Sequence, residues 1–378
     1  MVDETSLLNE FVTSEAAERI SVAPNWKLVW WRFKKHRLAV FSAVVLLFLY
    51  VIVLFPDFFS IVQPELADAR LAFIPMQGIR LFDGTRFRPW VPAVVGRRNP
   101  VTLRMEWEVD ETKKIPVGLF VRGYPYKIFG RFQTDIHLLG PASGNPEDRL
   151  YPLGTDRLGR DQWSRLMHGT RTSMTVGLVS VVLSVILGVI LGGISGYFGG
   201  LPDLIIQRLI EILQSLPTIP IWLAMTAAMP RDWPSDRVFF TITLILAFVG
   251  WTTLGREVRG RFLALREEDF VLAAELAGCS QMRIITRHMV PAFMSHIIAT
   301  STLAIPVMII SETSLSFLGL GIRPPAISWG VLLQEAQNIQ TIAHAPWLLL
   351  PGVVVIVSVL AWNLVGDGLR DAADPYGH

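Results

Sequence analysis

Six stretches of this chain are each long and apolar enough to cross a lipid bilayer as a helix. The hydrocarbon core of a bilayer takes about 20 apolar residues per helix, with roughly 17–25 as the usual range. The six stretches are residues 38–55, 173–198, 205–229, 238–256, 292–311 and 346–365. Charged residues make up only 17% of the chain, whereas soluble domains carry about 25%. We therefore expect an α-helical polytopic membrane protein with six transmembrane helices.

The segment before the first stretch is basic, which sets the expected orientation. Residues 25–37, NWKLVWWRFKKHR, carry Lys27, Arg32, Lys34, Lys35 and Arg37. Loops rich in Lys and Arg stay on the cytoplasmic side, so residues 1–37 are expected inside and 38–55 form the first anchor. A cleaved signal peptide is the alternative. We favour the anchor, because the basic region starts only near residue 27 and no convincing cleavage site follows Phe55.

Counting spans from there places residues 56–172 outside the cytoplasm and residues 257–291 inside. Residues 173–366 then form a five-helix core, and the tail 367–378 returns to the cytoplasm. The inner loop and its flanks carry Arg256, Arg259, Arg261, Arg266, Arg283 and Arg287. A short loop near Arg231 and Arg237 falls outside against the rule, but the two larger basic clusters outweigh it.

Residues 56–172 differ in composition from the rest of the chain. Runs such as VTLRMEWEVD alternate apolar and polar residues, which indicates β-strands, and RRNP and ASGNPED are typical of turns. We expect a β-rich extracytoplasmic insertion, either packed on the membrane part or serving as a docking surface for an external binding protein. Its last part, 151–174, is expected to form a turn and then an interfacial amphipathic helix, with Trp163, Leu166 and Met167 on one face.

Small and breaking residues mark the predicted core. Gly188, Gly192 and Gly196 recur every four residues, a spacing that lets helices pack closely in lipid. Pro217 and Pro220 must break or kink the third span, and unwound backbone in a membrane lines a cavity or is buried. Arg208 and Glu211 are expected to form an ion pair.

Two further residues belong to the predicted pathway or gate, together with those prolines: Pro306 and Glu312. Glu312 lies at the end of the fifth span, near its outer side, where ionisable residues usually face a cavity or a partner. A buried hydrogen bond that caps the following Gly-rich segment is the alternative for Glu312.

The inner loop contains a short, well-delimited pair of helices in FVLAAELAGCSQMRIITRHMVP, residues 270–291. Phe270, Ala273, Ala274 and Ala277 follow the spacing of one helical face. Three of these four are alanine, so the face allows close approach of another surface. Gly278 is expected as the left-handed residue that ends the first helix. Ser280 is expected to cap the second helix, and Pro291 to stop it.

The chain lacks the residues of a catalytic site. Cys279 is its single cysteine, and it contains no HExxH and no Gly-Lys pair, hence no Walker A loop. We expect no metal, no cofactor bound by this chain and no enzymatic activity, so any ATP is hydrolysed by another chain. A membrane-embedded enzyme lacks supporting residues, and a channel would not need the inner helix pair.

That helix pair resembles the coupling loop of bacterial ABC-importer permeases, whose pattern is Glu-Ala-Ala, three residues, Gly, then about a dozen residues to Pro. Ala273, Ala274, Gly278 and Pro291 match it, while Leu272 stands in place of the glutamate. PLGTDRLGRDQWSRLMHGTRTS, SGYFGGLPDLIIQRLIEIL, SETSLSFLGLGIRPPAISWG and APWLLLPG…NLVGDGLRDAADP resemble the dipeptide/oligopeptide "C" branch.

The resemblance implies the type I importer permease fold in the inner membrane, with both termini cytoplasmic. It implies a homologous permease subunit, two ATPase subunits that carry ATP and Mg, and an extracytoplasmic solute-binding protein. The implied ATPase-coupling residues are Phe270, Ala273, Ala274, Glu275, Ala277, Gly278, Ser280, Arg283, Ile284 and Pro291. The implied substrates are di- and oligopeptides, carried by alternating access; relatives import oligosaccharides, opine-like conjugates or nickel.

Overall fold

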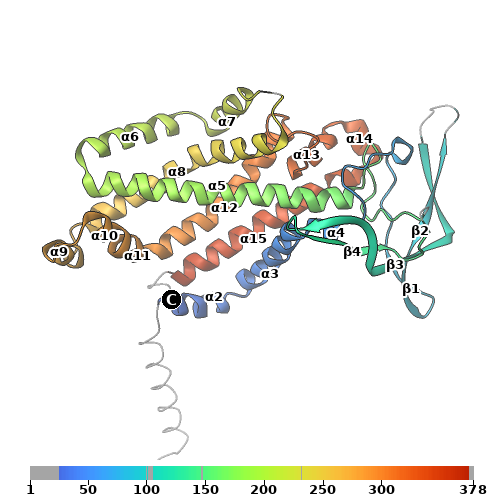
Figure 1. Ribbon diagram of the computed structural model, residues 1–378, viewed down its shortest axis with the longest axis horizontal. Coiled ribbons are helices and arrows are strands. Elements are labelled where there is room, and N and C mark those ends of the chain that lie inside the picture. Colours follow the sequence, from blue (N-terminus) through green and yellow to red (C-terminus); the bar gives the residue numbers. More distant parts are fainter. Residues whose placement is uncertain (1–24, 99, 101–104, 146–147, 231, 374–378) are drawn as a thin grey trace, which may run out of the picture.

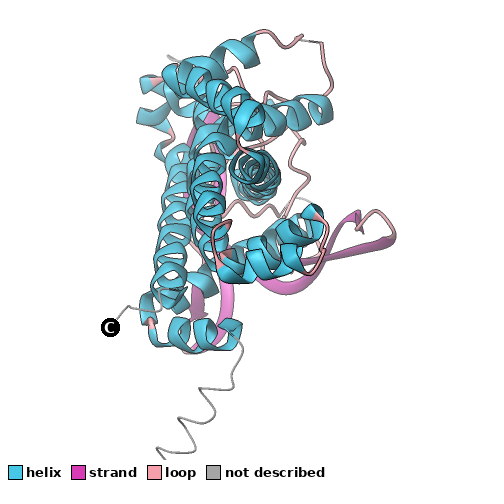
Figure 2. Cartoon of the chain, turned by 90° about the vertical axis from the view of Figure 1, so that its left-hand side faces the viewer, coloured by secondary structure: helices cyan, strands magenta, loops and turns pink. Residues whose placement is uncertain are grey.

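The computed structural model describes residues 25–98, 100, 105–145, 148–230 and 232–373. The ends of the predicted N-terminal segment and C-terminal tail, and Arg231, lie outside these ranges. A long helical bundle carries a β-sheet at one end and a group of short helices at the other (Figure 1). We call these the sheet end and the island end, and we call the short helices of residues 269–292 the island. Figure 2 looks from the island end, with the strands behind the helices.

Five helices of the described chain have the length and hydropathy of a transmembrane span. They are α3 (Arg37–Leu54), α5 (Gln162–Phe198), α8 (Ser235–Leu265), α12 (Met294–Phe317) and α15 (Leu350–Ala373), which a 3₁₀ turn at Pro346–Leu349 precedes. A sixth crossing is made if α6 (Gly200–Ser215) and α7 (Thr218–Ala227) count as one span, bent by 90° between them. The bend falls at Pro217, as the two prolines predict.

The sheet is a four-stranded antiparallel meander in the order β1 (Arg80–Asp83), β2 (Arg86–Arg98), β3 (Met105–Ile128) and β4 (Phe132–Pro141). The first half of β3 pairs with β2 and its second half pairs with β4. Strand β3 thus joins two hairpins. Val91, Ile115 and Leu150 form a small apolar core beneath them. The predicted β-rich insertion is therefore present.

Short elements complete the chain. At the sheet end these are α4 (Pro56–Phe59), a 3₁₀ turn (Ala69–Leu71), α13 (Trp329–Gln334), a second 3₁₀ turn (Glu335–Gln337) and α14 (Ile339–His344). Helix α2 (Asn25–Lys35) precedes α3. At the island end are α9 (Asp269–Leu276), α10 (Gln281–Ile284), a π-helical turn (Ile285–Met289) and α11 (Val290–Ala292).

One predicted element needs correction. Residues 162–172 do not form a separate interfacial helix but are the first turns of α5, which continues unbroken to Phe198. Arg165 is as buried as Leu166 and Met167, because its charge is paired inside the protein. At the other terminus, α15 runs through the start of the predicted tail to Ala373, and Gly368 packs on Ala39.

The close approach of α5 to α8 depends on glycine. A Cβ on Gly192 would lie 2.4 Å from the carbonyl oxygen of Gly255, and one on Gly196 would lie 2.7 Å from that of Arg259. A Cβ on Gly188 would lie 3.2 Å from the carbonyl oxygen of Trp251 in α8. Any larger side chain at these positions would push the two helices apart.

Candidate functional site

Helix α9 is closed at both ends by local backbone geometry. It begins after Glu268, and Asp269 lies in its first turn, where carboxylates stabilise the partial positive charge of a helix N-terminus. It ends at Leu276, and Gly278, two residues later, has the expected left-handed conformation with φ +75°. The Gly278 amide donates to the Glu275 carbonyl at 2.9 Å, and the Cys279 amide to the Ala274 carbonyl at 3.1 Å. These two bonds define a Schellman motif.

The two sides of α9 have different surroundings. Val271 and Ala274 are buried against Phe262, Ile284 and Met289 of the same chain. The expected face of Phe270, Ala273, Ala274 and Ala277 is therefore corrected at one position: Ala274 points inward, while the other three are exposed. The reason is that Ala274 lies one turn after Val271 and shares its inward side.

The outward side is more apolar than the sequence analysis recognised. Leu276 is 91% exposed, and Leu272 and Met282 are also exposed. Leu272 and Leu276 lie one turn apart, so they share one side of α9, whereas Phe270 is exposed on a different side of the same helix. In the sequence, these residues could have been identified as large apolar side chains within a strongly charged loop. We call Phe270, Leu272, Leu276 and Met282 the island patch.

The rest of the predicted coupling residues divide between the surface and the interior. Arg283 and Glu275 are exposed, whereas Ile284 is buried. Glu275 also fixes the island to the bundle, since the Tyr197 hydroxyl of α5 donates to its Oε1 at 3.2 Å. Ser280 occupies the position before α10, but its side chain makes no capping hydrogen bond there.

Pro291 does not stop the second helix, contrary to expectation. The chain stays helical from Gln281 to Ala292, and a π-helical turn at Ile285–Met289 comes directly before the proline. Proline has no backbone N–H to donate, and its ring crowds the preceding turn of a helix. The wider turn accommodates it, and α12 follows after Phe293.

Next to the island, a polar group joins α5, α6 and α8. Arg259 donates to both carboxylate oxygens of Asp203, at 2.5 and 2.7 Å. The Ser195 hydroxyl also donates to Asp203 and accepts from Gln207 at 3.0 Å. A bidentate pair of this kind fixes the orientation of its two side chains as well as their distance. The three helices next to the island are therefore held together by side-chain hydrogen bonds.

A cavity of about 840 Å³ lies in the bundle between α6, α7, α8 and α12. Leu213, Thr218, Trp222, Thr253, Leu303 and Val307 are among its apolar and neutral lining residues, and Arg256 and Glu257 are charged lining residues. The His296 ring lies 3.2 Å from a Glu257 carboxylate oxygen. The cavity therefore combines apolar walls with both charge signs.

The predicted pathway residues lie beside this cavity rather than on it. Pro217 and Pro220 are exposed, and their neighbours Thr218 and Trp222 line the cavity instead. Pro306 is buried within α12, next to the lining residue Val307. The prolines thus shape the helices that form the wall.

Glu312 makes the buried hydrogen bond that was the alternative to a role in the pathway. It is completely buried, and its carboxylate accepts a hydrogen bond from the Ser316 hydroxyl at 2.8 Å. The Ser316 oxygen accepts in turn from the amide of Ile322 at 3.0 Å. Glu312 therefore holds the Gly-rich segment after α12, and it does not line the cavity.

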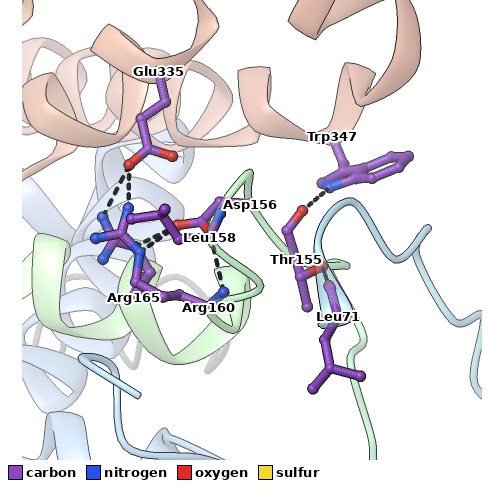
Figure 3. A network of polar contacts seen from close by, with 8 residues as sticks. All are labelled: Leu71, Thr155, Asp156, Leu158, Arg160, Arg165, Glu335 and Trp347. Atoms are coloured by element: carbon purple, nitrogen blue, oxygen red, sulfur yellow. Dashed lines mark hydrogen bonds and ion pairs between the residues drawn. The ribbon is translucent and has the colours of Figure 1, made fainter. Parts of the chain in front are cut away.

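At the sheet end, a buried charge network joins distant parts of the chain (Figure 3). Arg160 pairs with Asp156 at 2.6 Å and with Glu335, which Arg165 of α5 also contacts at 3.4 Å. Beside the network, the Trp347 indole donates to the carbonyl of Thr155 at 3.0 Å. The network ties the start of α5 to the segment between α12 and α15. Local sequence patterns do not predict this network, because Glu335 is 170 or more residues from its arginine partners.

Comparisons with known proteins agree on one family. Residues 184–376 match the family described as "Binding-protein-dependent transport system inner membrane component", and residues 25–75 match "N-terminal TM domain of oligopeptide transport permease C". The chain is 36% identical to the oligopeptide transport system permease protein OppC of Bacillus subtilis (strain 168), over 61% of this chain and 73% of that protein.

Two other relatives have a similar sequence identity to this chain. The dipeptide transport system permease protein DppC of Alkalihalophilus pseudofirmus is 37% identical over 62% of this chain and 77% of its own length. The glutathione transport system permease protein GsiD of Pectobacterium atrosepticum is 37% identical over 66% of this chain and 79% of its own length. Among solved structures, a chain of the MetNI methionine ABC transporter in an inward-facing conformation aligns with TM-score 0.39 and 15% identity, covering 54% of this chain and 95% of that one.

Proposed function

This chain belongs to the family of binding-protein-dependent transport system inner membrane components, which are ABC-importer permease subunits, and we propose that the passage it forms carries di- and oligopeptides. The relatives named for oligopeptide, dipeptide and glutathione transport support this substrate class, since all three cargoes are peptides. Oligosaccharides, opine-like conjugates and nickel are not favoured by any of these names.

Several statements follow directly from family membership. The chain is a multi-pass inner-membrane permease with the type I importer fold, and it is not an enzyme. Proteins of this family work with an ATPase and an external binding protein. We propose the fuller arrangement of two permeases and two ATPases, with ATP and Mg held by the ATPases. In this arrangement both chain ends and the island face the cytoplasm, and the sheet faces outward.

The exposed island patch is the observation that carries the proposed coupling mechanism. Leu276 is 91% exposed on α9, at the end of the molecule away from the sheet, and large exposed apolar residues concentrated in one short segment indicate a protein interface. An ATPase cleft would bury Phe270, Leu272, Leu276 and Met282, with Ala273, Ala277 and the Gly278 turn at close range. Arg283 and Glu275 would supply the polar rim.

Movement of the ATPases would then reach the passage through α5 and α8. The island rests on α8 and is bonded to Tyr197 of α5, and α8 lines the inner cavity. ATP-driven closure of the ATPases would draw the island toward that of the partner permease and open the passage outward. Hydrolysis would reset it. Apolar walls with both charge signs suit peptides, whose termini carry opposite charges.

Transport by the reconstituted complex tests this function. The permease, its homologous partner, the ATPases and the binding protein are placed in proteoliposomes, and ATP-dependent uptake of a labelled tripeptide is compared with that of a labelled oligosaccharide and of nickel. We expect uptake of the peptide alone. Uptake of oligosaccharide or nickel without peptide would refute the substrate class, and uptake without ATP would refute the importer mechanism.

A further inference from the structure

The hairpin of β3 and β4 turns back from the sheet toward the bundle. Its tip lies beside the sheet end of the first span, where the ring of Phe129 is 5.5 Å from the ring of Phe55, measured between centroids. Further along β3, Phe120 lies 6.1 Å from Phe58. Phe55 directly follows the last residue of α3, so the hairpin tip lies at the level where this span leaves the membrane.

One side of α3 is an exposed apolar stripe. Its members are Leu38, Phe41, Val44, Leu47, Phe48, Val51 and Leu54. Because α3 is a transmembrane span whose opposite side packs on α5 and α15, this stripe is a lipid-facing surface. It ends at Leu54, one residue before the contact between Phe55 and Phe129.

The hairpin tip continues this surface beyond the end of the helix. Phe129 and Phe132 are 65% and 69% exposed, and Gly130 and Arg131 form the turn between them. Two exposed phenylalanines next to a lipid-facing stripe make one continuous apolar surface. Such residues at the membrane boundary are stabilised by entering the headgroup region.

A cleft of about 350 Å³ separates the tip from α3 and α5. Leu54 and Phe129 form its apolar rim, while Lys127 and Arg171 bring two positive charges into it. Neither Lys127 nor Arg171 belongs to an ion pair among the residues that the structure describes. Asp57 also lines the cleft, and its charge attracts Arg171, while its Oδ1 accepts from Tyr124 at 3.1 Å and faces His168 at 3.5 Å.

We propose that the β3–β4 hairpin is a membrane anchor, whose Phe129 and Phe132 enter the bilayer interface while Lys127 and Arg171 bind the phosphate of a phospholipid headgroup. Continuity with the lipid-facing stripe of α3 favours lipid over a protein partner. The cavity proposed to form the passage is lined by α6, α7, α8 and α12, and none of its lining residues that the structure describes belongs to α3 or the hairpin. The anchor would hold the insertion at a fixed height above the passage.

Site-directed spin labelling tests the position of the tip. Cys279 is the single cysteine, so Cys279→Ser gives a background in which Phe132→Cys is labelled alone. Phe87→Cys is the matched control, because Phe87 is 68% exposed on the other hairpin and Phe132 is 69% exposed. The assembled transporter is placed in nanodiscs of phosphatidylethanolamine and phosphatidylglycerol, and collision rates with oxygen and with a water-soluble nickel chelate are measured.

We expect the ratio of oxygen to nickel collisions to be several-fold higher at residue 132 than at residue 87. Equal ratios would overturn the proposal. Protection of residue 132 from both reagents in the assembled transporter, but not in the permease alone, would also overturn it and indicate a protein contact.

A second experiment tests the headgroup site. Phosphatidylglycerol binding to the detergent-solubilised transporter is measured by native mass spectrometry for Lys127→Gln and Arg171→Gln. A basic residue near an anionic lipid surface contributes about 1 kcal/mol, so each variant is expected to weaken binding about fivefold. Lys127→Arg should bind like the unaltered protein. Arg122→Gln removes a charge from an 87%-exposed side chain of the same strand; if it weakens binding as much as Lys127→Gln, the site is refuted.

Discussion

The amide of Cys279 donates to the carbonyl oxygen of Ala274 at 3.1 Å, across a left-handed Gly278. This bond makes the end of α9 a self-contained backbone structure. A Cβ added at Gly278 would meet nothing within 4 Å in this chain. A substitution there therefore changes what a partner meets, together with the strain of the turn, and leaves the permease core intact.

Gly278→Asp is expected to uncouple ATP hydrolysis from transport. The change adds a charge and a Cβ at a surface proposed to press on the ATPase, and L-residues are strained at this φ. We expect ATPase activity that no longer responds to the loaded binding protein, and uptake reduced by at least about tenfold.

Gly84→Asp is the matched control for backbone strain, since Gly84 has φ +64° and equally open surroundings in the β1–β2 turn. The control should transport normally. Unaltered uptake by Gly278→Asp at normal expression would refute the coupling assignment.

Leu276→Arg is expected to weaken binding of the ATPase subunits. Full burial of a leucine contributes about 1.5–3 kcal/mol, which corresponds to about tenfold or more in the dissociation constant. Copurification of the ATPases with the permease measures the effect. Leu81→Arg replaces an exposed leucine of β1 and should copurify as before; equal losses in both variants would contradict the island as the docking site.

Val307→Trp is expected to obstruct the passage. Val307 lines the cavity of about 840 Å³ and is 55% exposed, so a larger side chain can enter the open space without overpacking the core. We expect reduced peptide uptake by a complex that still assembles. Val44→Trp, on the lipid-facing side of α3 with 60% exposure, should transport normally, and the prediction fails if the two variants behave alike.

Glu335→Ala is expected to destabilise the sheet end. It removes one of two carboxylates, Glu335 and Asp156, that Arg160 and Arg165 both contact, and removal of one partner of a buried pair costs up to about 3–5 kcal/mol. The exposed pair of Arg208 and Glu211 offers the contrast, because an exposed pair contributes about 0–1 kcal/mol. Thermal unfolding in detergent should therefore shift strongly for Glu335→Ala and little for Glu211→Ala; similar shifts would contradict the network's role.

Asp161 is expected to make stability pH-dependent. Burial raises the pKa of this carboxyl to about 6, against the opposing hydrogen bonds from Ser164. A raised pKa means that the folded state holds a proton which the unfolded state releases, so this contribution to stability falls as the pH rises from about 4 to 6. Asp161→Asn lacks this titration. The difference in melting temperature between Asp161→Asn and the unaltered protein should change between pH 4.5 and 7.5, in favour of the variant at the higher pH, and a constant difference would contradict the assignment.

Local patterns in the sequence predicted much of this fold. Hydropathy located the spans, alternation located the sheet, and Gly278 and Pro217 marked turns whose geometry depends on a few neighbouring residues. The inward side of Ala274 could not be predicted in the same way, because it depends on where α8 and α10 lie. The pairing of Arg165 with Glu335 is set by tertiary contact alone, and the π-helical turn before Pro291 is a compromise between proline and continuous helix.

The unbroken course of α5 has a mechanical consequence. Its 37 residues rise by 1.5 Å each, which gives a rod about 55 Å long. Arg165 is held in the charge network at one end, and Tyr197 is bonded to Glu275 of the island at the other. An α-helix with complete hydrogen bonding shortens little, so displacement of the island must emerge at the far end as tilt or rotation. The same reasoning applies in the other direction. A displacement at the sheet end would reach the island as a tilt or rotation of α5, so this one helix can transmit motion both ways between the two ends of the bundle.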